Sequence, residues 1–173
     1  MEKHAATQGI VALFEHYKDL AEKAVAQVRD EDLHRILGAD GNSISVIMRH
    51  MAGNMRSRFT DLLTSDGEKP WRDREGEFTE TLLDRSELLE DWNSGWQCFF
   101  LAARPLNDED LRRTVRIRNE EHTVLDALQR QLAHYAYHVG QIIVLARAFS
   151  GNSWRSLSIP RDATTKFNRK RGL

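Results

Sequence analysis

Four long segments of the chain repeat apolar side chains at the spacing of an α-helix, and this pattern limits the possible folds most. The segments cover roughly residues 6–28, 43–64, 84–103 and 123–149. In each of them, apolar residues recur three or four positions apart, which gathers them in one stripe along the helix. Helices that carry one apolar stripe bury it against each other. The sequence therefore predicts an all-α protein built as a four-helix bundle.

Length and composition are those of an ordinary globular protein. The 173 residues are enough for one domain with a substantial core, so we expect residues 1–173 to form a single domain with an irregular tail over 152–173. The formal net charge of −1 argues against a general binder of nucleic acid or of anionic membranes. The single cysteine, Cys98, excludes an internal disulfide, and no apolar run approaches the length of a membrane span. These features predict a cytoplasmic protein.

Local signals mark the boundaries of the helices and the nature of the connections. Ser43 and Thr123 are suitable first residues for the second and fourth helices, and Gly151 is a stop signal. Residues 65–79 are rich in glycine and charge, which predicts a long loop that can form the rim or lid of a pocket. Residues 114–118 alternate in polarity, as in a short strand or one arm of a hairpin.

The fourth helix carries two histidines one turn apart. With His134 placed at 0°, His138 falls near 40° and Gln141 near −20°, at the border of the buried arc. Two imidazoles in this relation can share a metal ion. The alternative is a pair of histidines at the edge of the core that hydrogen-bond to their neighbours. For Gly140, next to this pair, we expect a packing role in which a neighbouring helix comes close.

The second helix carries a similar polar stripe. With His50 at 0°, Asn54 falls near 40° and Ser57 near −20°, while the apolar arc spans about 60° to 180°. Two such stripes facing each other would form a polar pocket inside an apolar bundle, where bundles usually hold metal ions. A simple solvated edge is the alternative. The other histidines fall on a terminus, a polar face or polar loops, and we expect no site role for them: His4, His16, His34 and His122.

Two stretches of the sequence resemble the DinB-like superfamily, which includes damage-inducible proteins and thiol-dependent transferases. The first runs from Ser43 to Asn54 (SISVIMRHMAGN) and the second from Thr123 to Ile142 (TVLDALQRQLAHYAYHVGQI). The tail from Ser158 to Asn168 looks like one sub-family of unknown function. The resemblance implies a four-helix bundle with an up-down-down-up course and a long crossover between its second and third helices. It also implies a divalent metal, zinc or nickel, whose three imidazole ligands carry over to His50, His134 and His138.

The resemblance leaves the reaction open. Three imidazoles leave a fourth coordination position free, as in catalytic zinc sites. We therefore expect a metal-dependent enzyme, either a thiol-dependent S-transferase or a metal-assisted hydrolase, with a low-molecular-weight thiol and an electrophile as substrates. The alternative is a non-catalytic metal-binding bundle that acts as a stress-linked interaction module. Asn54 and Gln141 are candidates to hydrogen-bond an imidazole or a substrate, with packing roles as the alternative. The resemblance also implies a homodimer, and we expect no nucleic-acid or membrane partner.

Overall fold

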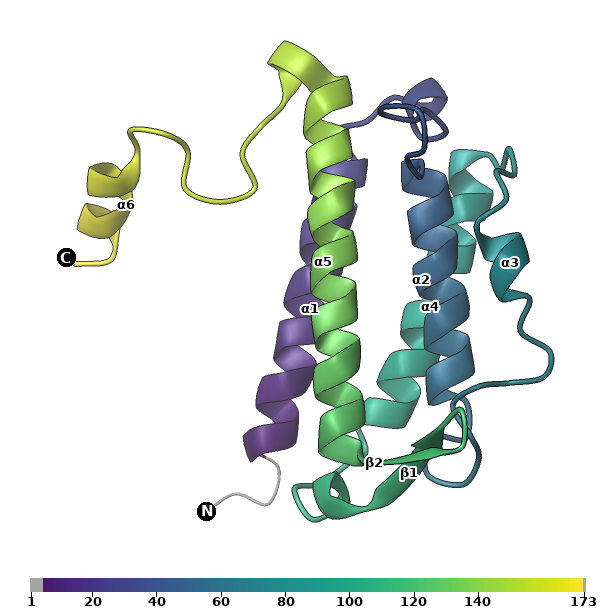
Figure 1. Cartoon of the computed structure of the whole chain (residues 1–173). Helices are drawn as coiled ribbons and strands as arrows, with labels where there is room; N and C mark the ends of the chain where they lie inside the picture. The colour runs from purple at the N-terminus through teal and green to yellow at the C-terminus, as the bar shows by residue number, and fades with distance from the viewer. Residues whose placement is uncertain (1–4, 173) are drawn as a thin grey trace.

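The computed structural model describes residues 5–172, and long helices dominate it (Figure 1). The four long helices are α1 (Ala5–Val25), α2 (Ile44–Phe59), α4 (Arg85–Ala103) and α5 (Val124–Ser150). The shorter elements are α3 (Arg74–Glu77), α6 (Thr164–Lys170), and the 3-10 turns η1 (Asp30–Asp32), η2 (Asp110–Arg112) and η3 (Gly151–Ser153). Strand β1 (Thr114–Ile117) pairs antiparallel with β2 (Glu120–Thr123), as expected for a hairpin. The predominantly helical class predicted from the sequence is confirmed.

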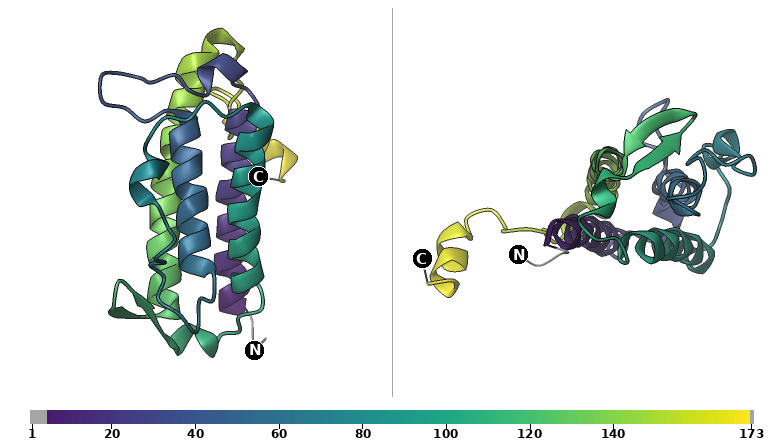
Figure 2. Two further views of the ribbon diagram at one scale, coloured as in Figure 1. Left: turned by 90° about the vertical axis from the view of Figure 1, so that its right-hand side faces the viewer. Right: turned by 90° about the horizontal axis from the view of Figure 1, so that it is seen from below.

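The long helices lie side by side, as the view from below shows (Figure 2). Helix α2 packs mainly against α4, α1 packs against α5, and α2 also contacts α5. The chain colours show that α1 and α5 run in one direction while α2 and α4 run in the other (Figure 1). Because α2 and α4 are parallel, the connection over residues 60–84 returns along the length of the molecule. This connection places α3 against α2.

Side-chain caps fix where the helices begin. The Ser43 hydroxyl accepts a hydrogen bond from the backbone N–H of Val46 at 3.1 Å, and Thr123 forms a capping box with Asp126. Such caps stabilise a helix by about 1 kcal/mol each. Helix α2 ends at Phe59, short of the predicted end near residue 64, so that prediction was wrong. The next residues are extended and then left-handed, with φ 51° at Asp61, and this backbone cannot continue a helix.

Aromatic side chains from three helices form the centre of the core. Phe14, Phe99 and Tyr135 are fully buried, and the Phe14 and Phe99 ring centroids lie 4.3 Å apart. Trp92 and Trp96 are buried as well, which confirms the third helix as a core element. A Cβ added to Gly95 of α4 would lie 2.7 Å from the Cα of Ala52 in α2. The absence of a side chain at residue 95 therefore permits the close approach of these two helices.

The C-terminal region departs from the predicted irregular tail over 152–173. It contains η3, which contacts α5, and the two-turn helix α6, which projects away from the long helices (Figures 1 and 2). Residues 164–170 carry a continuous run without glycine or proline, which permits a helix even where little packs against it. None of the described helices is long and apolar enough to cross a membrane.

Candidate metal centre

Three histidines from two helices meet at the α2–α5 contact. His50 comes from α2, and His134 and His138 lie one turn apart on α5. The Nε2 atom of His134 lies 3.3 Å from Nε2 of His50 and 3.0 Å from Nε2 of His138. His50 and His138 are buried, with 4% of each residue exposed, and His134 is partly buried. The tertiary structure therefore brings together the three residues singled out in the sequence.

Hydrogen bonds at the far ring nitrogens decide which nitrogens face the centre of the cluster. The Nδ1–H of His50 donates to Glu77 Oε2 at 2.9 Å, and the Nδ1–H of His138 donates to Gln141 Oε1 at 2.8 Å. Both acceptors are oxygens, so each Nδ1 carries the proton and each neutral ring has its lone pair on Nε2. At least two lone pairs therefore point into the same small space, toward His134.

This donor set suits a divalent ion. The edge of a tetrahedron with zinc–nitrogen bonds of 2.0–2.1 Å is about 3.3 Å, close to the Nε2 separations of 3.0 and 3.3 Å around His134. Without an ion, one N–H of His134 must serve two acceptor nitrogens. Within residues 5–172, no cysteine, aspartate or glutamate joins the three histidines. The cluster can therefore hold a metal and leave a coordination position to water or to another molecule.

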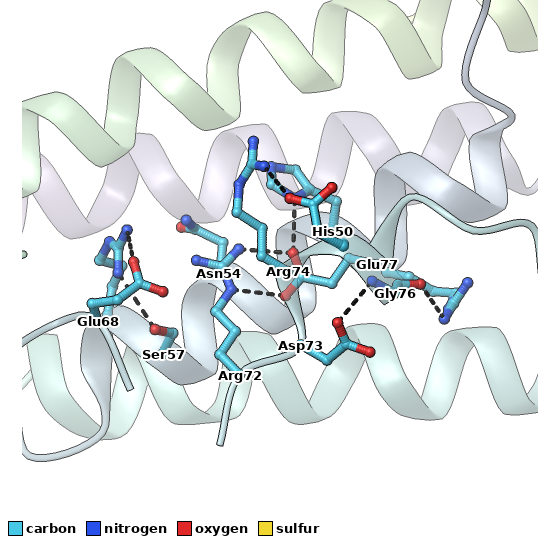
Figure 3. Close-up of polar contacts among 12 residues, drawn as sticks. His50, Asn54, Ser57, Glu68, Arg72, Asp73, Arg74, Gly76 and Glu77 are labelled. Atoms are coloured by element: carbon cyan, nitrogen blue, oxygen red, sulfur yellow. Dashed lines mark hydrogen bonds and ion pairs between the residues drawn. The ribbon is translucent and has the colours of Figure 1, made fainter. Parts of the chain in front are cut away.

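Glu77 holds the His50 ring in place. Its carboxylate also receives two hydrogen bonds from Arg72, from Nε to Oε1 and from Nη2 to Oε2, both at 2.8 Å. Figure 3 shows Glu77 between Arg72 and His50. A carboxylate behind a metal-binding imidazole fixes the ring orientation and makes the opposite nitrogen a better donor. The Arg72–Glu77–His50 chain thus positions one candidate ligand from a different segment of the protein.

Gly53 makes room for this carboxylate. It lies on α2, three residues after His50, and a Cβ added there would lie 2.1 Å from Oε1 of Glu77. Helix α3 is stabilised at its start by Asp73, whose Oδ1 accepts a hydrogen bond from the backbone N–H of Gly76 at 2.9 Å (Figure 3). Helix α3 thereby places Glu77 against Gly53 of α2, where no side chain blocks its approach to His50.

Burial keeps His134 and His138 neutral. Desolvation lowers the pKa of His134 to about 3 and that of His138 to about 4, because it penalises the charged imidazolium. Repulsion from His138 and His50 adds to the effect at His134, and the hydrogen bond to Gln141 opposes it at His138. Burial alone would raise the pKa of Glu77, but the hydrogen bonds from Arg72 and His50 outweigh it and hold this pKa below its usual value of 4.5. Neutral imidazoles beside an ionised carboxylate are the forms that bind metal.

The two amide candidates have different surroundings. Gln141 contacts His138, whereas the Oδ1 of Asn54 accepts a hydrogen bond from the buried hydroxyl of Tyr135 at 3.0 Å. Asn54 thereby links α2 to α5 beside the histidines. Ser57 does not face the site, because its hydroxyl donates to the carbonyl of Gly67 at 2.7 Å.

The other histidines lie apart from the cluster. His16 is exposed on α1, His34 bonds to Glu80 and to the carbonyl of Leu83, and His122 lies in β2. His4 lies outside the described residues. The expected packing role of Gly140 is wrong, since nothing lies within 4 Å of a Cβ added there. Gly53 and Gly95 are two helical glycines at which another part of the chain does come close.

A cavity of about 340 Å³ lies beside the histidines. Its lining includes all three histidines, both amide candidates and two aromatic rings, Phe78 and Tyr137. A larger hollow of about 710 Å³ lies between α2, α3 and α4, but no histidine lines it. Its lining mixes basic and acidic residues and includes Glu77. We therefore place the candidate site in the smaller cavity.

Sequence reasoning missed Arg72 and Glu77, because both lie in the segment predicted to be a loop. A charged run of residues gives no indication of which side chain will turn inward. One signal for a nearby group was present, namely Gly53, a glycine inside the predicted second helix, three residues after His50. A glycine in a helix interior costs about 1 kcal/mol relative to alanine and often marks a close approach of another group.

Comparison with known proteins gives a family and no activity. A family model described as "Protein of unknown function (DUF1572)" matches residues 5–163, which is most of the chain. No curated protein and no solved structure matches the chain.

Proposed function

The chain belongs to the DUF1572 family, and from its histidine cluster we propose that it is a metal-dependent enzyme. The metal ligands in this proposal are His50, His134 and His138, and the ion is zinc or nickel. The observation that carries the proposal is the convergence of three Nε2 atoms. Those of His138 and His50 lie 3.0 and 3.3 Å from that of His134. Glu77 and Gln141 support it, since each orients one of the three rings.

We also propose that the fold is the up-down-down-up four-helix bundle of the DinB-like superfamily, formed as one domain. The parallel course of α2 and α4, with a long connection between them, supports this topology (Figure 1). The histidines fall at the positions that the resemblance implies, one on α2 and two on α5. A homodimer and a low-molecular-weight thiol as co-substrate belong to the same proposal and rest on the resemblance alone.

Among the described residues, no fourth His, Cys, Asp or Glu ligand joins the cluster, which favours catalysis over a closed structural site. No carboxylate or thiol of residues 5–172 joins the three imidazoles, and a cavity adjoins them. When bound, a divalent ion at such a site lowers the pKa of a coordinating thiol or water and so provides a nucleophile at neutral pH. The protein contributes the orientation of His50 by Glu77, and the rings of Phe78 and Tyr137 form part of the cavity wall. The reaction class is transfer of a thiolate to an electrophile, or hydrolysis.

The second candidate function is a non-catalytic metal-binding module. One observation favours it: the histidines come from both α2 and α5, so a shared ion would tie the two helices together. In that case removing the metal would mainly reduce stability. In the enzyme, removing the metal would abolish turnover under conditions where the protein stays folded.

The first experiment is the metal content of untagged protein, measured by elemental mass spectrometry. We expect about one divalent ion per chain in the wild type and nearly none in His50→Ala, because the loss of one of three ligands removes most of the affinity. His16→Ala is the matched control, since His16 is exposed and lies outside the cluster. Metal-loaded protein is then assayed with small thiols and a chromogenic electrophile. Wild-type protein that stays metal-free after incubation with zinc and nickel would contradict the proposal.

A further inference from the structure

The cavity beside the histidines is lined by five arginines and by no aspartate or glutamate. These arginines are Arg58 on α2, Arg72 and Arg74 in the α2–α4 connection, Arg118 in the hairpin turn and Arg130 on α5. The whole chain has 25 basic and 26 acidic residues, so an overall basic composition does not explain this cluster. The tertiary structure gathers positive charge from four separate segments around one cavity.

The two most buried of these arginines already form ion pairs within the protein. The side chains of Arg58 and Arg72 are 8% and 2% exposed, and they pair with Glu68 and Glu77. Arg118 at the rim also pairs with Glu68, at 2.9 Å, so one carboxylate serves two guanidinium groups. Three arginines therefore share two carboxylates, and the positive charge left over favours the binding of an anion in the cavity.

Two rim arginines remain available to a ligand. The side chain of Arg74 is 48% exposed, and its partner Glu75 is 88% exposed, so this ion pair contributes little and is easily replaced. Arg130 is exposed and forms no ion pair with any residue in the described part of the chain. It lies one helical turn before His134 and therefore on the same face of α5. Guanidinium groups match carboxylate and phosphate oxygens in two-point contacts.

A buried amide gives an independent sign that a ligand binds here. Gln131 is only 4% exposed and lines the cavity, yet its side-chain oxygen has no hydrogen-bond partner. Buried polar atoms in native proteins are nearly always paired, so a missing partner requires an explanation. Rotation of the amide by 180° would offer its N–H groups at the same place. In the rotated orientation an N–H of this amide can donate to a carboxylate or phosphate oxygen of a ligand, whereas the unrotated oxygen requires a ligand group that donates, such as a hydroxyl.

We propose that the substrate of the site is a small organic anion that carries carboxylate or phosphate groups. Arg74 and Arg130 bind the anionic groups at the rim, and the reactive end of the molecule reaches the histidines. A cavity of about 340 Å³ fits a small metabolite rather than a polymer. The inference rests on the proposed function, because it assigns the anion to the substrate of the proposed metal centre.

The test separates the anion from the metal. Succinate and inorganic phosphate are titrated into metal-free wild-type protein by calorimetry, which shows whether carboxylate or phosphate is preferred. The double variant Arg74→Gln with Arg130→Gln is compared with Arg147→Gln, an exposed α5 residue outside the cavity. We expect at least a tenfold loss of affinity in the double variant, no change in Arg147→Gln, and weaker binding at high salt. Circular dichroism verifies that the exposed substitutions leave the helices intact.

A second arm uses zinc-loaded protein with mercaptosuccinate, which has two carboxylates, and with the uncharged 1-thioglycerol. We expect mercaptosuccinate to bind at least tenfold more tightly, with the preference lost in the double variant. Absence of anion binding, or an equal loss in Arg147→Gln, would overturn the inference. If succinate binds but no metal is retained, the proposed enzyme fails while the anion site stands. If metal is retained without a preference for anions, the inference fails and the metal centre stands.

Discussion

Substitution of Gly53 by alanine tests whether the approach of Glu77 to α2 supports the candidate site. The added Cβ would lie 2.1 Å from Oε1 of Glu77, whereas contacts of a real Cβ stay above 3.0 Å. The carboxylate must therefore retreat by about 0.9 Å, which can lengthen its hydrogen bonds of 2.8 and 2.9 Å to about 3.7 and 3.8 Å. Such distances are beyond hydrogen bonding, so Gly53→Ala should release both Arg72 and His50.

The size of the effect follows from two opposing contributions. A hydrogen bond to a charged group contributes about 1.5–3 kcal/mol, and alanine in place of a helical glycine adds back about 1 kcal/mol. Gly140→Ala is the matched control, because Gly140 is also in a helix beside a candidate ligand and nothing lies within 4 Å of its added Cβ. The gain from alanine applies to both variants and cancels between them, so we expect Gly53→Ala to be less stable than Gly140→Ala by about 3–6 kcal/mol, the contribution of the hydrogen bonds to Arg72 and His50.

The assay has two readouts. Urea denaturation of the metal-free proteins gives the free energy of unfolding, and competition with a chromophoric chelator gives the zinc affinity. We expect the zinc affinity to fall about 10- to 100-fold in Gly53→Ala and to stay unchanged in Gly140→Ala, since only the first displaces the partner of His50. Equal stability and equal zinc affinity in the two variants would refute the argument that Glu77 positions His50.

Three further predictions test the surroundings of the cluster. Glu77→Gln should weaken zinc binding about 10- to 100-fold, and an unchanged chelator competition would show that the carboxylate serves stability alone. Tyr135→Phe should cost about 1–3 kcal/mol in urea denaturation, because it leaves the buried Oδ1 of Asn54 unpaired, while zinc affinity stays near wild type. A large loss of zinc affinity would instead show that the Tyr135–Asn54 hydrogen bond supports metal binding. Metal-free protein should lose stability as the pH falls from about 6.5 toward about 4, the higher of the two folded-state pKa values. The folded-state pKa values of His134 and His138, about 3 and 4, lie below the unfolded value of 6.5, so the unfolded state takes up protons first. A stability that is flat across this window, measured by urea denaturation at several pH values, would contradict the lowered pKa values.

Local sequence information was sufficient to predict the long helices and to place two of the three histidines, His134 and His138, together. The apolar spacing and the caps at Ser43 and Thr123 predicted the starts of α2 and α5 correctly. The same spacing placed His134 and His138 on one face, because residues four apart always lie about one turn apart on a helix. The up-down-down-up course of the four helices could not be obtained in this way. It rests on the resemblance to the DinB-like superfamily and stays a proposal.

The residue at which α2 ends and the presence of a helix in the C-terminal tail depended on backbone conformation rather than on the apolar periodicity. The apolar pattern continues past Phe59, but the left-handed backbone at Asp61 ends α2 earlier. In the same way, the tail over residues 152–173, which the sequence predicts to be irregular, contains the helix α6. Periodicity reports which face of a helix is buried, and it is silent about the residue at which the chain turns away.

The sequence by itself determined which side chains share a helix face, because that depends only on the local geometry of the backbone. Only the tertiary structure decided that His50 meets His134, 84 residues further along, and that Glu77 and Arg72 lie behind it. The same holds for the arginines around the cavity, which come from four separate segments. Contacts between segments depend on how helices pack and on where a bare backbone, as at Gly53, lets another chain segment approach. No spacing within a single segment records this information.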